Sequence, residues 1–230
     1  MILTAEIFIK DNMDGILNID KPKDWTSHDV VAKIRSHFKI KKVGHAGTLD
    51  PNATGVLLIC LGKATKKASF LTGQKKTYEG TLLLGTTTDT QDIKGKVIRK
   101  MKVEKIDAEL LSSILKELTG DISQIPPMYS AVHYKGERLY KLARKGIKVN
   151  PEPRKVHIYS IELLSINIPE ISIRVVCSKG TYIRTLANTI GEKLGYGACL
   201  KDLRRIQVGD FHIKDSLVLK DVLKTKEWIL

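Results

Sequence analysis

The stretch GHAGTLDPNATG, residues 44–55, combines residue types that could do chemistry on a bound ligand. Gly44 and Gly47 let a ligand approach the backbone closely. Pro51 biases the residue before it toward an extended backbone, so Asp50 is predicted to present its carboxylate from a loop. The opposing interpretation is that Asp50 only hydrogen-bonds to its own turn, as aspartates often do. The residues of this stretch leave both interpretations open.

A second candidate cluster is CSKGTYIRT, residues 177–185. Thr181 is predicted to cap the helix that follows a strand here. Tyr182 and Arg184 are two residues apart, a spacing that in an extended or first-turn backbone can direct both side chains into one cleft. If Arg184 meets Asp50, it keeps that carboxylate ionised and fixes its direction. The alternative is a solvated Arg184 on a helix with Tyr182 in the core.

Hydrophobic periodicity predicts the elements that would hold these clusters. Helices are expected behind a cap at Thr26 or Ser27, over Ala64–Leu71, over 107–118 and after Thr181. Residues Lys41–Gly55 show no periodicity and are predicted to form a loop. The predicted strands are 15–20, 55–60, 77–85, 155–167 and 171–177. Their irregular alternation with helices predicts a mixed α/β (α+β) fold in a single domain spanning 1–230, rather than a doubly wound sheet.

The charge balance points to a polyanionic partner. The chain has 39 Lys+Arg against 25 Asp+Glu, a formal net charge of +14. Such an excess attracts nucleic acid first and an anionic membrane second. No apolar run approaches the ~20 residues of a membrane span, and no signal peptide precedes the domain. We therefore expect a protein of the cytoplasm, without a membrane association.

Several familiar catalytic sites are missing from the sequence. The P-loop pattern, the dinucleotide-binding GxGxxG and the GxSxG elbow do not occur. The six histidines are not at metal-ligand spacing, and the three cysteines lie far apart without a C-x-x-C. These absences favour chemistry done by protein side chains on a polyanion.

The segment from about 124 to 150 interleaves basic and aromatic residues. Such mixtures suit folded RNA, because cations bind phosphates while rings contact bases. The alternative is an ordinary solvated loop. The candidate RNA-binding residues are Lys135, Arg138, Lys141, Arg144, Lys145 and Lys148.

Seven motifs in a fixed order resemble one family. They are KPKDWTSHDVV, GHAGTLDPNATGVL, KTYEG, LGTTTDTQD, PPMYSAVHYKGERLYKLAR, SKGTYIRTLA and LRRIQVGDF, between about Gly15 and Phe211. The ordered set closely resembles the tRNA pseudouridine-55 synthases of the TruB type. The resemblance implies the pseudouridine synthase fold, a mixed and largely antiparallel sheet flanked by helices and loops. It implies that one uridine in the T stem-loop of tRNA is isomerised, without a cofactor, metal or obligate protein partner.

The resemblance also assigns residue roles. Asp50 matches the catalytic aspartate and Arg184 the arginine paired with it. His45 matches a histidine that helps the target nucleotide to flip, and Tyr78 a tyrosine that stacks on the flipped base. The segment 124–150 corresponds to an RNA-clamping insertion. The remaining matches are the active-site Tyr182, the apolar pocket residue Leu203, and Lys21 and Pro22, which support the catalytic loop.

The sequence departs from the family pattern at two places. Many relatives continue into a C-terminal RNA-binding PUA domain, and the short remainder after Phe211 leads us to expect none here. Lys23 and Asp24 stand where relatives usually place a glycine in KPxGxTS, so this turn is expected to differ. Three rival functions are an RNA-folding chaperone on the same fold, a guide-RNA-dependent synthase acting on ribosomal RNA, and a generic basic RNA-binding module.

Overall fold

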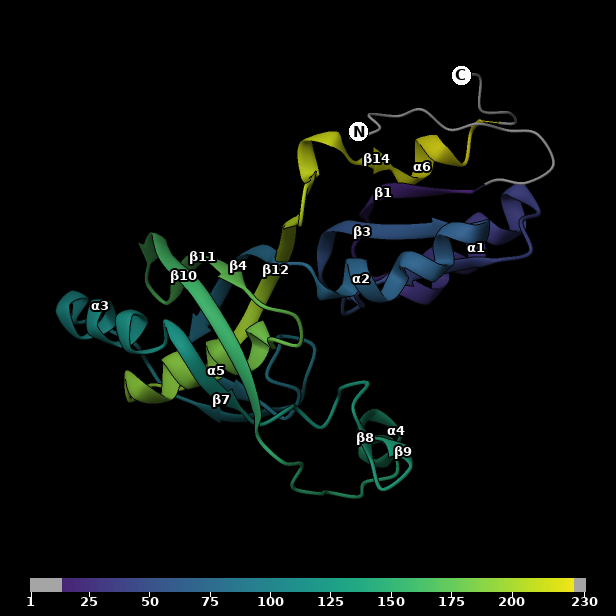
Figure 1. Ribbon diagram of the computed structural model, residues 1–230. Helices are drawn as coiled ribbons and strands as arrows, with labels where there is room; N and C mark the ends of the chain where they lie inside the picture. The colour runs from purple at the N-terminus through teal and green to yellow at the C-terminus, as the bar shows by residue number, and fades with distance from the viewer. Residues whose placement is uncertain (1–13, 226–230) are drawn as a thin grey trace. The chain divides into compact units, whose positions relative to one another are not determined.

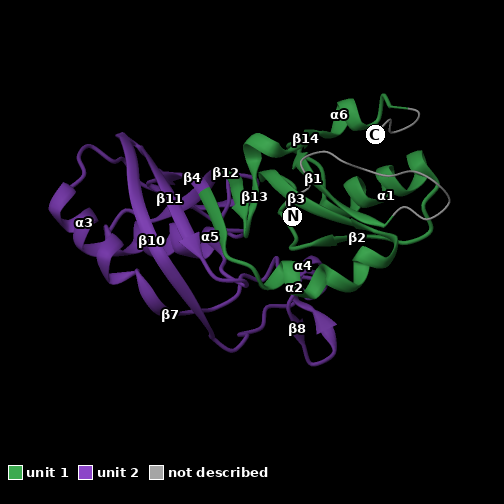
Figure 2. Cartoon of the chain, turned by 45° about the horizontal axis from the view of Figure 1, so that its top comes forward, with its two compact units in different colours: residues 1–78, 203–230 green, residues 79–202 purple. Residues whose placement is uncertain are grey.

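The computed structural model describes residues 14–225 of the 230-residue chain (Figure 1). The chain divides into two compact units (Figure 2). The first contains residues up to Tyr78 together with those from Leu203 onward, and the second contains Glu79–Asp202. No helix among the described residues is long and apolar enough to cross a membrane.

The first unit is built on a mixed sheet. β3 pairs antiparallel with β1 along its whole length and with β2, while β14 is parallel to β1. The last part of β12 is parallel to β3, with Arg204 opposite Thr54. The strands are β1 (Gly15–Lys21), β2 (Val43–Ala46), β3 (Thr54–Leu61), β12 (Ala198–Val208), β13 (Phe211–His212) and β14 (Leu217–Val218). The helical segments are α1 (Ser27–Phe38), η1 (Gly62–Lys67), α2 (Ala68–Gly73), η2 (Ile213–Asp215) and α6 (Leu219–Val222).

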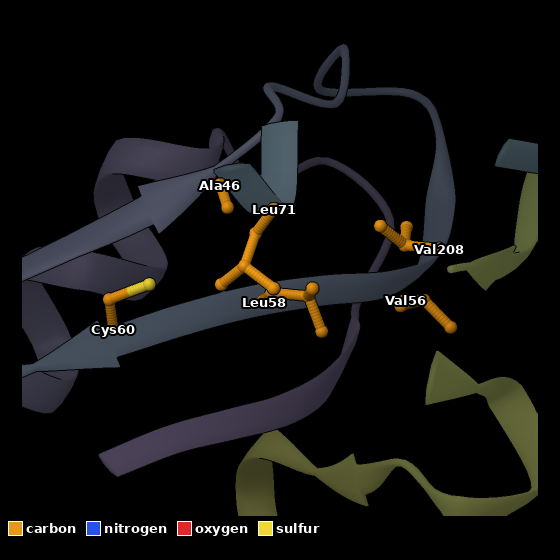
Figure 3. Close-up of a cluster of buried hydrophobic side chains, with 6 residues drawn as sticks. All are labelled: Ala46, Val56, Leu58, Cys60, Leu71 and Val208. Atoms are coloured by element: carbon orange, nitrogen blue, oxygen red, sulfur yellow. The ribbon is translucent and has the colours of Figure 1, made fainter. Parts of the chain in front are cut away.

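β3 is the centre of this unit because seven of its eight residues are buried. One side of it packs in a cluster with residues of β2, α2 and β12 (Figure 3). In that view Leu71 of α2 reaches down to Leu58 of β3. The continuous apolar run of β3 is typical of a strand covered on both faces. The cluster consists of Ala46, Val56, Leu58, Cys60, Leu71 and Val208.

The second unit has strands in the order β4-β11-β10-β7. β11 alternates between half-buried and buried residues, the pattern of a strand with one face in the core. α3 packs against α5 and β10. The strands are β4 (Lys76–Leu84), β5 (Thr86–Thr88), β6 (Val97–Lys100), β7 (Gly120–Gln124), β8 (His133–Tyr134), β9 (Glu137–Arg138), β10 (Arg154–Asn167) and β11 (Glu170–Cys177). The helices are α3 (Ala108–Glu117), α4 (Leu139–Arg144) and α5 (Ile183–Lys193).

The predicted mixed α/β (α+β) class is confirmed, since each unit combines strands with covering helices. The predicted loop Lys41–Gly55 is wrong in part, because Val43–Ala46 forms β2. Four residues are too few to show a period, and their pairing with β3 is not a local feature of the sequence. The predicted helix over Ala64–Leu71 is instead a 3-10 turn followed by α2.

Gly55 marks the closest approach of β3 to β12. Its φ is +101°, and a Cβ there would overlap the backbone carbonyl oxygen of Arg205. Gly120 has the same φ of +101°, but open space surrounds the position of its Cβ. The two glycines therefore share a backbone conformation and differ in steric surroundings.

We expect Gly55→Ala to destabilise the protein more than Gly120→Ala. The positive φ alone costs about 1–2 kcal/mol in each variant, and overlap with the β12 backbone adds roughly 1–3 kcal/mol for Gly55→Ala. The free energy of unfolding, from denaturant titrations of both variants, measures the difference. Equal losses of unfolding free energy in the two variants would contradict this expectation, because they would show that β12 shifts away from β3 at no energetic cost.

Candidate active site

Asp50 lies in the short connection between β2 and β3 and is half-buried. The backbone N–H of Ala53 donates to the Asp50 carbonyl oxygen at 3.0 Å, which closes a turn over Pro51. Asp50 thus sits at the start of a tight turn whose two ends are anchored in the core strands. The side chains that fix this turn come from β1, α1 and β12.

Lys21, the last residue of β1, is fully buried and holds the turn from one side. Its Nζ donates to the carbonyl oxygens of Pro22 at 2.8 Å, Trp25 at 2.5 Å and Pro51 at 3.1 Å. Burial lowers the pKa of Lys21 to about 8, and the nearby Asp50 carboxylate opposes that shift. Lys21 therefore makes a hydrogen bond to the residue after Asp50, and its supporting role in catalysis stays a prediction.

The N-terminus of α1 binds the turn at the residue before Asp50. Ser27 Oγ donates to the Leu49 carbonyl oxygen at 3.2 Å and accepts from the Leu49 N–H at 2.9 Å. α1 itself begins with a capping box between Thr26 and Asp29. The main chain on either side of Asp50 is consequently fixed by side chains from α1 and β1.

Arg205 of β12 joins both ends of the connection. Only 1% of this residue is exposed. Its Nε donates to the Val56 carbonyl oxygen at 2.7 Å and its Nη2 to the Gly47 carbonyl oxygen at 3.0 Å. A single guanidinium therefore ties the end of β2 to the start of β3 and closes the loop that carries Asp50. Sequence reasoning assigned no role to Arg205.

Asp24 stands where the family pattern KPxGxTS has a glycine, and its backbone conformation explains why an aspartate is accepted there. Asp24 has a φ of +63°, in the left-handed region where glycine is favoured. Its N–H donates to the Pro51 carbonyl oxygen at 2.8 Å. Aspartate tolerates this conformation better than most residues with a side chain, so the backbone keeps the turn that the family pattern assigns to glycine.

His45 lies on β2 rather than in the predicted loop. Burial and the charge of Arg205 lower the pKa of its imidazole, so the ring is neutral at pH 7. Its Nδ1 is buried and has no hydrogen-bond partner among the described residues. A neutral, half-buried ring suits contact with a base better than binding of a phosphate.

Asp50 is the only carboxylate in a long basic stretch. Between Val30 and Tyr78 the sequence has ten Lys or Arg residues and no other Asp or Glu. Opposite charges favour the ionised form of a carboxyl group. This part of the chain is therefore strongly basic and attracts polyanions.

Arg184, in the first turn of α5, is 4% exposed, so the solvated alternative is wrong. Its Nη1 donates to the Thr90 carbonyl oxygen at 2.9 Å, and its Nη2 to the Tyr129 carbonyl oxygen at 2.9 Å. Its Nη1 also lies 3.5 Å from Asp92 Oδ2. The predicted Asp50–Arg184 ion pair would join the two units, and it remains a prediction.

Asp92 is a candidate residue that sequence reasoning missed. Its Oδ1 accepts from Thr90 Oγ1 at 2.9 Å and from the Lys94 N–H at 3.0 Å. Its Oδ2 faces Arg184. Its only signal in the sequence is its place in the motif LGTTTDTQD. The carboxylate orders the turn from Thr90 to Lys94, and it also orients the buried guanidinium.

Tyr182 occupies the N-cap of α5 and is half-buried. Gln124 of β7 binds its main chain from both sides, accepting from the Tyr182 N–H at 3.0 Å and donating to its carbonyl oxygen at 3.3 Å. The predicted cap at Thr181 is wrong, because its hydroxyl donates to the Ser178 carbonyl oxygen instead. Fixed cap geometry thus comes from a buried glutamine.

Two further predicted residues lie on strands near the places where the chain passes from one unit to the other. Tyr78 lies on β4 with 8% of its surface exposed. Leu203 lies half-buried on β12. Both belong to the first unit, which includes the first three residues of β4 and the last six of β12, as do Lys21, Pro22, His45 and Asp50.

Comparisons with known proteins identify the family of this chain. A family model described as "TruB family pseudouridylate synthase (N terminal domain)" matches residues 35–183, and "tRNA pseudouridylate synthase B C-terminal domain" matches 184–229. The chain belongs to the TruB family of pseudouridylate synthases. A relative named tRNA pseudouridine synthase B from Clostridium tetani is 51% identical over 210 residues, covering 91% of this chain and 73% of the relative. One of the same name from Geobacillus thermodenitrificans is 52% identical over 217 residues, covering 91% and 72%.

Similarity to solved structures confirms the predicted pseudouridine synthase fold. A chain in "Crystal Structure of a Cbf5-Nop10-Gar1 Complex" is 33% identical with a TM-score of 0.72, covering 91% of this chain and 54% of that one. A chain in "Structure of H/ACA RNP bound to a substrate RNA containing 2'-deoxyuridine" is 28% identical with a TM-score of 0.68, covering 97% and 65%. This chain thus spans about half to two thirds of those chains.

In this TruB-family chain, the segment 124–150 projects its cations outward. Leu139 and Leu142 of α4 are buried and anchor the segment. The Arg144 guanidinium lies 5.5 Å from the centre of the Tyr140 ring, and Lys145 pairs with Glu137 at 2.7 Å. The residues Lys135, Arg138, Lys141, Arg144, Lys145 and Lys148 are all exposed. Their binding to RNA remains a prediction.

No metal-binding cluster was found in residues 14–225, where no group of three or more His, Cys, Asp or Glu could hold an ion. The three cysteines are buried and form no disulfide among the described residues. The side chains gathered around Asp50 are instead suited to hold a main-chain turn and to favour negative charge.

The buried Lys21 predicts a specific pH dependence of stability. Its pKa falls from 10.5 to about 8 on folding, so between these values the unfolded chain binds more protons and stability rises with pH. Lys21→Met removes this contribution. We expect the free energy of unfolding of the wild type to increase relative to Lys21→Met from about pH 8 to 10.5.

Denaturant unfolding at several pH values measures this difference. Lys33→Met is the matched control, because Lys33 is an exposed lysine of α1 and its side chain stays in solvent. The free energy of unfolding of Lys33→Met should change with pH in the same way as that of the wild type. If the difference in free energy of unfolding between wild type and Lys21→Met stayed constant from about pH 8 to 10.5, it would contradict the lowered pKa of Lys21.

Proposed function

We propose that this chain is a tRNA pseudouridine synthase that isomerises the uridine at position 55 in the T loop. Membership of the TruB family and relatives named tRNA pseudouridine synthase B at about half identity support the activity. The observation that carries the proposal is Asp50, held on a turn by Lys21, Ser27 and Arg205 at the family's catalytic position.

The reaction exchanges one bond for another within a single nucleotide. The bond from the sugar C1′ to the base N1 breaks, the base turns, and C1′ bonds to C5. The proton lost from C5 is balanced by the proton gained at N1, so no oxidant, reductant or water is consumed. Attack on the sugar, attack on the base and removal of a sugar proton all need an ionised carboxylate, which is the role of Asp50.

The uridine must leave the base stack before Asp50 can reach it. Extrusion costs a few kcal/mol, which stacking and pocket contacts offset. Tyr78 supplies a ring for stacking, and the neutral His45 fits beside the extruded base. The family resemblance assigns Arg184 as the partner that keeps the catalytic aspartate anionic. It assigns Tyr182 as an active-site tyrosine and Leu203 as an apolar pocket residue.

RNA outside the pocket is held by phosphate contacts. The six exposed cations of the segment 124–150 bind the backbone of the T stem-loop without reading bases. Tyr140 stays close to Arg144 and presents a ring in the same region. Such a surface recognises the shape of folded RNA.

Replacing Asp50 by Asn tests the catalytic assignment. The amide cannot act as nucleophile or base, so we expect pseudouridine formation at position 55 of a T-arm transcript to fall by roughly a thousandfold or more. Chemical modification and primer extension measure the product. Asp210→Asn is the control, since Asp210 is an exposed carboxylate of the same unit.

Three outcomes separate the rival functions. Product with wild type and with Asp210→Asn, but none with Asp50→Asn, supports the proposal. Tight binding without product from the wild type favours an RNA chaperone or a guide-dependent enzyme and contradicts the proposal. Product from Asp50→Asn at the wild-type rate would remove Asp50 from the mechanism.

The RNA-clamping segment is tested by the salt dependence of binding. Each lost phosphate contact reduces the slope of log affinity against log salt by about 0.7–0.9. We expect Lys141→Gln with Arg144→Gln to flatten the slope by about 1.5. The control pair Lys116→Gln with Lys220→Gln removes the same charge from α3 and α6 and should leave the slope near wild type. An unchanged slope in the first pair would exclude the segment from RNA binding.

A further inference from the structure

The segment Lys94–Lys105 is strongly basic and lies outside every site described above. It contains six Lys or Arg residues and a single carboxylate, Glu104. All six cations are exposed, and so are the four residues of β6. The six are Lys94, Lys96, Arg99, Lys100, Lys102 and Lys105.

Little acidic charge neutralises this strand. Among the described residues, Lys96, Lys100 and Lys105 make no ion pair, while Lys102 pairs with Glu104 at 2.9 Å. Arg99 lies 3.8 Å from Glu192, and both side chains are largely exposed. Exposed pairs of this kind contribute little energy and release their partners readily. The strand therefore presents a nearly uncompensated row of positive charge.

The row begins at the loop that holds Arg184. Asp89 and Lys96 close this loop with two hydrogen bonds, Asp89 N–H to the Lys96 carbonyl oxygen at 3.1 Å and Lys96 N–H to Asp89 Oδ1 at 2.8 Å. Inside it, Thr90 and Asp92 bind Arg184. The first cations of the row thus share one short, hydrogen-bonded loop with the partners of the buried arginine.

The row then leads away from Arg184 toward the far end of α5. Arg99 Nη2 donates to the Gly195 carbonyl oxygen at 3.4 Å, and Tyr196 Oη donates to the Lys105 carbonyl oxygen at 3.0 Å. β6 itself has four residues, which span about 13 Å at the 3.3 Å per residue of an extended strand. That length accommodates a few successive phosphates of a nucleic-acid strand.

Exposed apolar side chains stand between the cations. The exposed fractions of Val97, Ile98 and Met101 are 49%, 68% and 42%. β6 pairs only with β5 within the described part of the chain, so its outer edge has no strand partner there. Such a surface can contact sugars while the cations bind phosphates.

We propose that Lys94–Lys105 is a phosphate-binding track for the RNA substrate, separate from the segment 124–150. The track follows β6 and receives the RNA backbone next to the loop that orients Arg184. This proposal rests on the proposed function for the identity of the RNA. The competing explanation is that the lysines protect an open strand edge from pairing with other chains, as edge lysines often do.

Salt-dependent binding of a T-arm RNA hairpin tests the track. The variant Lys96→Gln, Lys100→Gln, Lys105→Gln removes the three cations without an ion pair. We expect the slope of log affinity against log salt to flatten by about 2, with weaker binding at about 0.15 M salt. The control variant Lys116→Gln, Lys214→Gln, Lys220→Gln loses the same charge from other exposed positions and should keep the wild-type slope. Thermal unfolding verifies that both variants are folded.

The outcomes separate the track from the proposed function. A slope that changes equally in both variants, or in neither, overturns the track. If the track variant aggregates but binds RNA with wild-type affinity, the track proposal is contradicted. The lysines then protect the open strand edge instead. If the track variant alone loses slope while wild-type protein makes no pseudouridine, the track stands and the proposed function fails.

Discussion

Two buried cations that bind main-chain carbonyls fix the position of Asp50. Lys21 and Arg205 are almost fully buried, where a charge is costly unless it is well hydrogen-bonded. Their described hydrogen bonds go to the carbonyl oxygens of Gly47, Pro51 and neighbouring residues. These bonds hold the turn but do not cancel the positive charge, so the site favours a carboxylate within its turn.

The second unit uses the opposite arrangement around Arg184. There one buried guanidinium is surrounded by two carbonyl oxygens and the Asp92 carboxylate. Asp92 also accepts hydrogen bonds from its own turn, which makes the turn and the arginine interdependent. A change at either residue is therefore expected to affect the other. The basic row along β6 starts from this same turn.

Local signals predicted the long elements well and the short ones poorly. β3 and β11 were predicted because their apolar patterns are set by burial along a whole strand. Val43–Ala46 was predicted as loop because four residues are too few to show a period, and its pairing with β3 is not local. Thr181 was predicted to cap α5, but Gln124, 58 residues away in sequence, fixes the main chain there.

The sequence by itself determined the family, the mixed α/β class and Asp50 as the candidate catalytic residue. Ordered motifs carry that information because each preserves residue types that the chemistry needs. Only the tertiary structure decided how Asp50 is held, through Lys21, Ser27 and Arg205, and that Asp92 accompanies Arg184. These contacts join residues up to 158 positions apart, and no local pattern records which distant side chain will reach a given carbonyl oxygen.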